Sequence, residues 1–387
     1  MNYKTAGESH GSGLLAFIEN FPAGFTIDVE SINAELRRRQ GGYGRGGRQA
    51  IETDSVEILT GIWRGQTTGA PLTLWIKNKD SRIDSAPEIT NPRPGHVDLA
   101  GAIKFGLPIR PIMERASARE TAARVAAGAL AKQFLKSKGI TVIGFVRSIG
   151  DSDSSLTEFQ IQNFNREIDS LDFNELLRRR NRSEFYIVRS DSESEQWEIK
   201  LKKLIDKTSE EGDSVGGLIE ARAFGVPIGL GSHTQWDQKL DGDIAKSIMS
   251  IQAVKGVEIG LGFNVTKITG SKVHDPIEYD ISKAGNANRG FVRRTNNAGG
   301  IEGGISNGET IVVRCAMKPI PTMRKPLDSI DWNTKQPKQA TYERSDVCAV
   351  PAASVVVENV LAATLMSAFQ IFSDNDNSGN VSNVKYK

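Results

Sequence analysis

Two of the chain's four histidines stand among glycines, a setting that brings an imidazole close to a ligand. His10 lies in the segment GESHG, and His96 lies in RPGHVD. Glycine permits tight turns and close backbone approach, and imidazole exchanges a proton near neutral pH. We therefore take His10 and His96 as candidate functional residues at a ligand site, and a lone histidine among glycines is by itself weak evidence. His233 and His274 are expected to be surface or structural histidines.

A glycine- and arginine-rich loop, GGYGRGGRQ, follows the three consecutive arginines at 37–39 and carries Arg45 and Arg48. Such a loop is either a disordered RNA-binding segment or an ordered loop that presents guanidinium groups to phosphate. The stretch is short and has regular structure on both sides. We favour the ordered, phosphate-facing loop.

The helix expected to support these groups spans residues 113–139. Ser117 and Glu120 have the spacing of a capping box, and Gly139 is a typical helix stop. Alanine and glycine cover several sides of the helix, so other backbones can approach it closely. We expect this helix to be buried at the centre of the molecule.

Arginines also gather at the beginning of this helix, at positions 115, 119 and 124. Free backbone N–H groups and the positive end of the helix dipole make a helix N-terminus favourable for an anion. The alternative is that these arginines are solvated helix charges. Together with the glycine- and arginine-rich loop that carries Arg45 and Arg48, these arginines favour a phosphorylated ligand.

Strand patterns surround the predicted helix. Alternating apolar residues at 55–62 and 71–77, separated by turn residues, predict antiparallel pairing, and a second group begins near residue 216. A second apolar helix is expected from residue 350 to about 371. We predict an α+β protein with one catalytic domain over 1–372, a peripheral charged insertion at 151–214 and a flexible tail at 373–387.

Composition excludes several classes of protein. The chain has 387 residues and a net charge of +2, which gives no overall signature of nucleic-acid binding. Cys315 and Cys348 lie far apart in apolar runs and are expected to be buried free thiols in a reducing compartment. The chain shows neither 18 uninterrupted apolar residues nor a signal peptide, so we expect a cytoplasmic protein without a membrane partner.

These segments together resemble the chorismate synthase family over nearly the whole chain. The motifs that carry the resemblance, in the family's order, are GESHG (7–11), RRRQGGYGRGGRQ (37–49), RPGHVDLAG (93–101), ERASARETAARVAAGALA (114–131), NNAGGIEGGISNG (296–308), KPIPT (318–322) and RSDVCAVPAA (344–353).

The resemblance implies a reaction and a cofactor. The family converts 5-enolpyruvylshikimate 3-phosphate into chorismate by 1,4-anti elimination of phosphate, with reduced FMN that is not consumed overall. It also implies a β-α-β sandwich, with central helices between two antiparallel sheets, and a homotetramer. Substrate and flavin both carry phosphate, which explains the arginines.

The resemblance also implies roles for individual residues. His10 is the candidate acid near the departing phosphate, His96 sets the protonation of the reduced flavin, and Asp346 acts with the flavin in removing the proton. The residues implied for cofactor binding are Arg115, Ala116, Ser117, Gln252, Ala253, Gly303, Lys318, Pro319, Ile320, Pro321, Thr322 and Arg344. Arg39 and Arg45 match positions assigned to NADPH, or else they hold the substrate, for which Ser9, Arg48 and Arg119 are further candidates.

Other interpretations remain open at this point. A binder of RNA or of a phosphorylated ligand would need no flavin, and an NADPH:flavin oxidoreductase would release no phosphate. The sequence shows no additional nucleotide-binding unit. We therefore expect a monofunctional enzyme that depends on an external source of reduced flavin, and we expect no metal.

Overall fold

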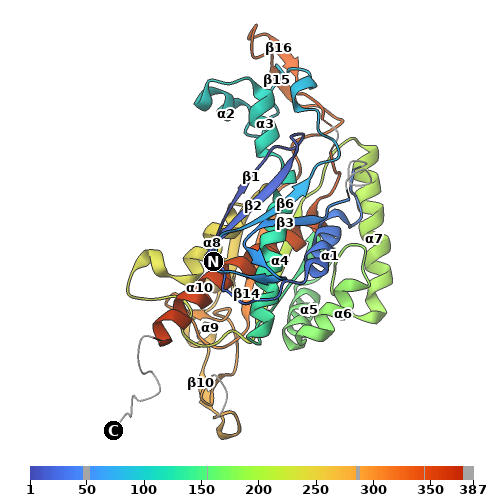
Figure 1. Ribbon diagram of the computed structural model, residues 1–387. Helices are drawn as coiled ribbons and strands as arrows, with labels where there is room; N and C mark the ends of the chain where they lie inside the picture. The colour runs from blue at the N-terminus through green and yellow to red at the C-terminus, as the bar shows by residue number, and fades with distance from the viewer. Residues whose placement is uncertain (47–52, 155, 285–287, 344, 378–387) are drawn as a thin grey trace.

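The computed structural model describes residues 1–46, 53–154, 156–284, 288–343 and 345–377. Among these residues, two four-stranded antiparallel sheets form the middle of the molecule, with long helices beside them (Figure 1). The prediction of a mixed α/β protein with antiparallel sheets is confirmed.

The first sheet has the strand order β1-β2-β6-β3. Buried and partly exposed side chains alternate along β2 and β6, because successive side chains of a strand point to opposite faces. Leu14 of β2 pairs with Ile76 of β6, and both are buried. The strands are β1 (Asn2–Ala6), β2 (Gly13–Glu19), β3 (Val56–Thr60) and β6 (Leu72–Lys77).

The second sheet has the strand order β7-β8-β14-β9. Its strands are longer, and the centre of β8 is buried on both faces. Helix α10 (Val350–Asn377) covers one face, and on the other face Arg222 of β8 bonds to Ile168 and Asp169 of α5 (Glu158–Ser170). The strands are β7 (Thr141–Ile149), β8 (Gly217–Phe224), β9 (Val254–Ile259) and β14 (Ile311–Met317).

The other elements are four short antiparallel strand pairs and ten α-helices within the described residues. The short antiparallel pairs are β4 (Ile62–Trp63) with β5 (Gln66–Thr67), β10 (Ile277–Tyr279) with β11 (Phe291–Arg293), β12 (Ile301–Glu302) with β13 (Ile305–Ser306), and β15 (Asp328–Ile330) with β16 (Pro337–Gln339). The helices are α1 (Val29–Gln40), α2 (Asp98–Phe105), α3 (Ile109–Ala116), α4 (Thr121–Ser137), α5 (Glu158–Ser170), α6 (Phe173–Asn181), α7 (Asp191–Glu210), α8 (Leu240–Met249), α9 (Gly270–Val273) and α10 (Val350–Asn377).

Helices α4 and α10 pack along each other at the centre of the molecule. α4 also contacts β2 and β6 of the first sheet, and α10 contacts β7 and β8 of the second. Their close approach depends on missing side chains. A Cβ on Gly128 of α4 would lie 2.2 Å from the carbonyl oxygen of Asn359 on α10, and a Cβ on Gly144 of β7 would lie 2.4 Å from that of Ser354.

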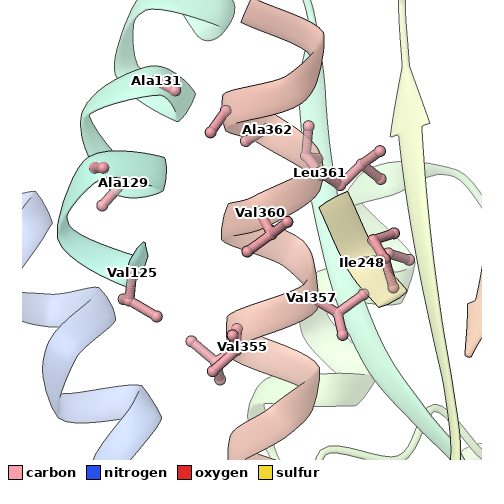
Figure 2. Close-up of a cluster of buried hydrophobic side chains, with 14 of the residues drawn as sticks. Val125, Ala129, Ala131, Ile248, Val355, Val357, Val360, Leu361 and Ala362 are labelled. Carbon is pink, nitrogen blue, oxygen red and sulfur yellow. The ribbon is translucent and has the colours of Figure 1, made fainter. Parts of the chain in front are cut away.

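The contact between the two helices is apolar and tightly filled. Figure 2 shows Val125 of α4 and Val355 of α10 pointing into the space between the helices, while Leu361 points away from α4 towards Ile248 of α8. The alanines of α4 complete the contact, and Ala122, Ala123, Ala126, Ala127 and Ala131 are fully buried. The expectation of a small-faced, buried central helix is confirmed for α4.

The predicted extent of this helix is wrong at its beginning. Residues 113–139 form the end of α3, a 3₁₀ turn, η3 (Ala118–Glu120), and then α4. Ser117 lies between α3 and η3 with φ −59° and ψ 143°, which ends the α-helical path. Gly139 follows the end of α4 in the left-handed region, at φ +78°, as expected for a helix stop.

The predicted capping box is also wrong. Ser117 Oγ accepts a hydrogen bond from the N–H of Arg119, at 3.2 Å, but the carboxylate of Glu120 does not reach back to it. Glu120 instead accepts hydrogen bonds from Thr5, Arg124 and Gln252. Tertiary partners for a buried carboxylate have displaced the local cap.

The structure confirms the second apolar helix, expected from residue 350 to about 371, as α10. The helix continues to Asn377, so the first five residues of the expected flexible tail are helical. Its Val350–Phe372 stretch is long and apolar enough to cross a membrane by length and composition alone, but most of this stretch is buried within the fold. It is therefore the core helix of Figure 1. Cys315 and Cys348 are free and buried, as predicted, and burial raises the pKa of each thiol to about 12.

A small lobe made of α2, α3 and the β15–β16 hairpin lies at one end of the molecule (Figure 1). It has its own hydrophobic cluster, separate from the main one, formed by Ile89, Ala102, Ile109 and Met113 with Trp332 packed against them. Because His96 lies two residues before the beginning of α2, this lobe carries one of the two candidate histidines.

The charged segment 151–214 folds into α5, α6 and α7. It contributes Arg180, whose NH1 lies 2.9 Å from Oε2 of the fully buried Glu358 on α10. The same carboxylate receives the guanidinium of Arg38 at 3.0 Å and the backbone N–H of Gly144 at 2.8 Å. This network joins α1, α6, α10 and β7. It holds the last turn of α1, which also carries Arg39.

Candidate active site

A cavity of about 670 Å³ lies between the small lobe and the main body of the molecule. Its volume falls within the range of small-molecule sites, roughly 300–1,000 Å³. Segments that are far apart in the sequence line it. The predicted site residues that it brings together are Ser9, His10, Arg39, Arg45, His96, Ala116, Ser117, Arg119, Gln252, Ala253, Lys318, Ile320, Pro321, Thr322 and Asp346.

His10 follows β1 in a tight loop and is held from behind by Glu114 of α3. Its Nδ1 lies 3.0 and 2.9 Å from the two carboxylate oxygens, and its backbone N–H donates to Oε2 at 2.9 Å. Asp80 Oδ2 is 3.7 Å from Nε2 on the other side of the ring. The loop itself is fixed by Asn78, whose Nδ2 donates to the carbonyls of residues 8, 9 and 11.

His96 has the same arrangement in the opposite lobe. Its Nδ1 lies 2.5 Å from Oδ1 of the fully buried Asp98. Arg93 donates to Asp98 through Nε at 2.8 Å and through its backbone N–H at 3.1 Å, and its NH1 donates to Thr322 at 2.8 Å. Burial alone would raise the pKa of Asp98, but hydrogen bonds from His96 and Arg93 outweigh it and hold this pKa well below its usual range.

The arginines of the main body surround one buried carboxylate. Arg119 NH1 lies 2.7 Å from Oδ1 of Asp54, and Arg39 NH2 lies 2.9 Å from Oδ2. Arg39 also donates to Thr121 at 3.3 Å, and Arg119 donates to Asn78 at 3.0 Å. Burial lowers the pKa of Arg39 to about 10, with Arg119 and Arg45 contributing in the same direction and Asp54 opposing them. The cavity wall therefore has an excess of positive charge, suited to an anion.

Asp346 lies at another side of the cavity, in the loop before α10. Its Oδ2 is 2.5 Å from NH1 of Arg45, and its Oδ1 accepts the backbone N–H of Gly46 at 2.6 Å. In the described part of the predicted phosphate-facing loop, which ends at residue 46, the ion pair of Arg45 with Asp346 attaches the loop to the segment that leads into α10.

Gln252 and Ala253 form a tight turn between α8 and β9. Gln252 Nε2 donates to Glu120 at 3.0 Å, while its Oε1 is buried without a hydrogen-bond partner. Ala253 has φ +68°, in the left-handed region that costs a non-glycine residue roughly 1–2 kcal/mol. Lys318 joins this wall, since its N–H donates to the carbonyl of Ala253 at 3.0 Å and its ammonium group reaches that of Gly95.

Comparison with known proteins identifies the family. A family profile described as chorismate synthase matches residues 1–370. The chain belongs to the chorismate synthase family. The chorismate synthase of Geobacter metallireducens is 50% identical over 95% of this chain and 93% of its own length, and that of Geotalea daltonii is 52% identical over the same shares. A solved crystal structure of chorismate synthase matches with a TM-score of 0.73 and 40% identity, covering 97% of each chain.

Chorismate synthase is a carbon–oxygen lyase that catalyses the last step of the shikimate pathway. It removes phosphate from 5-enolpyruvylshikimate 3-phosphate by 1,4-anti elimination and gives chorismate. The family uses reduced FMN. The function expected from the seven motifs is thereby confirmed.

Some residues expected to bind the cofactor of chorismate synthase do not line the cavity. Arg115 donates to the carbonyls of Gly7 and Thr5, at 3.0 and 2.8 Å, so it supports the loop of His10 from outside. Pro319 lies beside the cavity wall, and Gly303 is exposed at the turn between β12 and β13. Arg48 and Arg344 lie outside the described residues.

Several residues at this chorismate synthase cavity were not among the residues predicted from the sequence. Glu114, Asp80 and Arg93 line it, and Asp98 and Asp54 hold its histidine and arginines. Asp98 follows His96 by two positions, so the RPGHVD motif contained a local signal. Glu114 is 104 positions from His10, and no local pattern connects them. His233 and His274 are exposed and lie outside the cavity lining, as expected of surface histidines.

Proposed function

We propose that the elimination takes place in the cavity between the two lobes, with 5-enolpyruvylshikimate 3-phosphate and reduced FMN bound there together. The observation that carries this proposal is the convergence of His10, His96 and Asp346 on one cavity with three arginines of the main body. Such a site matches a substrate with one phosphate and two carboxylates beside a phosphorylated cofactor.

The residues of one wall fit a flavin. The unpartnered Oε1 of Gln252 supplies a buried acceptor for an N–H of a ring, and the ammonium group of Lys318 suits a phosphate. Ala116, Ser117, Gln252, Ala253, Lys318, Ile320, Pro321 and Thr322 would hold the group, and Arg115 would act by supporting the loop of residues 7–11. When bound, reduced FMN supplies electron density that assists the departure of phosphate.

His10 is the group we propose as the acid. Its Nδ1 faces Glu114, which leaves Nε2 as the atom that gives a proton to the departing phosphate. His96 would govern the protonation of the flavin from the small lobe, and Asp346 would take part in removing the C6 proton. Arg39, Arg45 and Arg119, with Ser9, would bind the substrate's anionic groups in a site shielded from water.

The source of reduced flavin decides between two forms of this enzyme. We propose a monofunctional enzyme that receives reduced flavin from an external source, with Arg39 and Arg45 binding the substrate. In the alternative, Arg39 and Arg45 bind NADPH, which acts as the reductant. The test is an anaerobic assay of phosphate and chorismate, first with chemically reduced FMN and then with oxidised FMN plus NADPH. Product only with reduced FMN supports the proposal, product in both supports an intrinsic reductase, and product in neither contradicts the proposed site.

Substitution of His10 tests the chemistry at the site. His10→Ala should lower kcat by about 100-fold, the usual contribution of a general acid, with FMN binding unchanged by flavin fluorescence. His233→Ala is the matched control, because His233 is exposed and outside the cavity. Unchanged turnover in His10→Ala would remove His10 from the mechanism.

We also propose the organisation around this site. Residues 1–372 would form one catalytic domain, with 151–214 as a peripheral part and the tail at 373–387 dispensable. The domain would be a β-α-β sandwich. Two observations support this proposal: α4 and α10 contact different sheets, and one hydrophobic cluster includes residues from Met1 to Met366. The assembly would be a cytoplasmic homotetramer, testable by sedimentation, with neither nucleic acid nor membrane as a partner.

A further inference from the structure

Glu114 holds the loop of His10 through both its main chain and its side chain. Its carbonyl oxygen accepts the backbone N–H of Ser9 at 3.0 Å, and its carboxylate accepts the backbone N–H of His10 at 2.9 Å. The same carboxylate lies 2.9 Å from the ring Nδ1 of His10. The Glu114 side chain is 0% exposed, whereas 15% of the His10 side chain is exposed. The carboxylate is thus shielded from solvent.

The charged groups around this pair favour an ionised Glu114. Arg110 NH1 lies 3.5 Å from Oε1 of Glu114 and shares its guanidinium with Glu343. Asp80 faces Nε2 of His10, and Arg82 lies 3.0 Å from Asp80. Burial alone would raise the pKa of Glu114, but hydrogen bonds from His10 and the charges of His10 and Arg110 outweigh it and lower this pKa.

An ionised carboxylate accepts hydrogen bonds and cannot donate them. Nδ1 of His10 must therefore carry a proton wherever it bonds to Glu114. In the neutral ring with this tautomer, Nε2 has a lone pair towards the cavity; in the cation, Nε2 has a hydrogen there.

We propose that Glu114 is a positioning residue of the elimination, which fixes the Nδ1–H bond of His10, aims Nε2 into the cavity and stabilises the imidazolium that protonates the departing phosphate. In the elimination, the electron pair of the C6–H bond forms the C1=C6 double bond, the C1=C2 pair moves to C2=C3, and the C3–O bond breaks with its electron pair on oxygen. The C6 proton leaves to the base in which Asp346 takes part. The Nε2 proton passes to a phosphate oxygen, and His10 remains neutral with Nδ1–H on Glu114. The inference rests on the proposed role of His10 as the acid.

A merely structural Glu114 would only hold the loop of residues 7–11, and its loss would reduce folding and every binding step. A positioning Glu114 predicts effects that depend on pH and on His10. Glu114→Gln keeps an acceptor oxygen but removes the charge, so its loss of kcat should be smallest at low pH and should grow as the pH rises. Glu114→Ala removes both the charge and the acceptor, so its kcat should fall about 100-fold across the pH range.

The decisive experiment is a double-mutant cycle. The kcat of His10→Ala, Glu114→Ala and the double variant is measured anaerobically with excess reduced FMN. If Glu114 acts only through His10, the double variant should be no more than about threefold slower than His10→Ala. A double variant that is slower by the product of both single effects overturns the inference.

Control variants separate the alternative causes. Glu220→Gln removes a carboxylate that is equally buried, paired with Arg222 at 2.6 Å and outside the cavity lining, so it should lower stability and leave kcat unchanged. FMN binding and thermal melting report folding for every variant. If Glu114→Ala does not fold, the pH profile of Glu114→Gln is the test. A ratio of its kcat to that of the wild type that stays constant with pH overturns the inference. Slow His10→Ala with normal Glu114→Ala overturns this inference alone, whereas normal His10→Ala overturns the proposed acid as well.

Discussion

Asp98 lies behind His96 as Glu114 lies behind His10, with 2.5 Å between Asp98 Oδ1 and His96 Nδ1. Both carboxylates are fully buried, and each bonds to Nδ1 of its histidine. Arg93 NH2 also lies 3.0 Å from Nδ1 and 3.4 Å from Nε2 of His96. Each carboxylate favours the tautomer of its histidine that carries a proton on Nδ1.

Replacement of Asp98 by asparagine should change the tautomer of His96. The amide NH₂ can donate to Nδ1 and move the ring proton to Nε2, and Arg93 loses its counterion. We expect kcat to fall about 10- to 100-fold, the usual effect of losing a partner that orients a functional histidine. The anaerobic assay with reduced FMN measures it. Asp328→Asn, an exposed change in the same lobe, should behave as wild type; equal losses in both variants would contradict the assignment.

Asp54 should act on substrate binding through two arginines. Asp54→Asn leaves the guanidinium groups of Arg39 and Arg119 buried beside an uncharged amide. Without the carboxylate to hold them, both side chains should change their orientation in the cavity wall. We expect KM for 5-enolpyruvylshikimate 3-phosphate to rise about tenfold with a smaller change in kcat, as for a loss of uniform binding. Steady-state kinetics at saturating reduced FMN measure both constants. An unchanged KM would show that the arginines do not contact the substrate.

Gly128 should be intolerant of even one methyl group. A Cβ there would lie 2.2 Å from the backbone oxygen of Asn359, and backbone cannot move aside as a flexible side chain can. Gly128→Ala should therefore separate α4 from α10 and lower the free energy of unfolding by about 3 kcal/mol. Urea denaturation measures the loss. Gly242→Ala in α8 is the control: its Cβ would meet no atom closer than 3.9 Å, so stability should stay equal or rise by about 0.5–1 kcal/mol.

Glu358 should make the free energy of unfolding depend on pH in the acid range. Burial would raise its pKa, but Arg38, Lys132 and Arg180 outweigh burial and hold this pKa below its usual range. The stabilisation is then fully present above the unfolded-state pKa of about 4.3, and it is lost as the pH falls from there towards the lower pKa of the folded state.

Glu358→Gln should accordingly destabilise the protein by about 3–5 kcal/mol at pH 7, because it leaves buried cations without their partner. The difference from wild type should narrow when denaturation is repeated below pH about 4. Glu195→Gln, an exposed change on α7, is the control and should have little effect at either pH. A difference that stays constant with pH would mean that packing, and not charge, is responsible.

The sequence determined the parts of this protein that depend on local pattern. The alternation of residues 71–77 gave β6, the small residues of 122–131 gave a helix that others can approach closely, and Gly139 gave its end. The motifs were also sufficient to place the chain in its family. These features depend on the order of neighbouring residues, so they are visible without a fold.

Only the tertiary structure decided which groups meet. The expected continuous helix 113–139 is interrupted at Ser117, because Glu120 finds tertiary partners that a local capping box does not supply. The partner of His10 is 104 positions away in the chain, and a single buried carboxylate at residue 54 gathers Arg39 and Arg119. Buried charges must find counterions wherever the chain brings them, and that choice depends on packing and not on sequence neighbourhood.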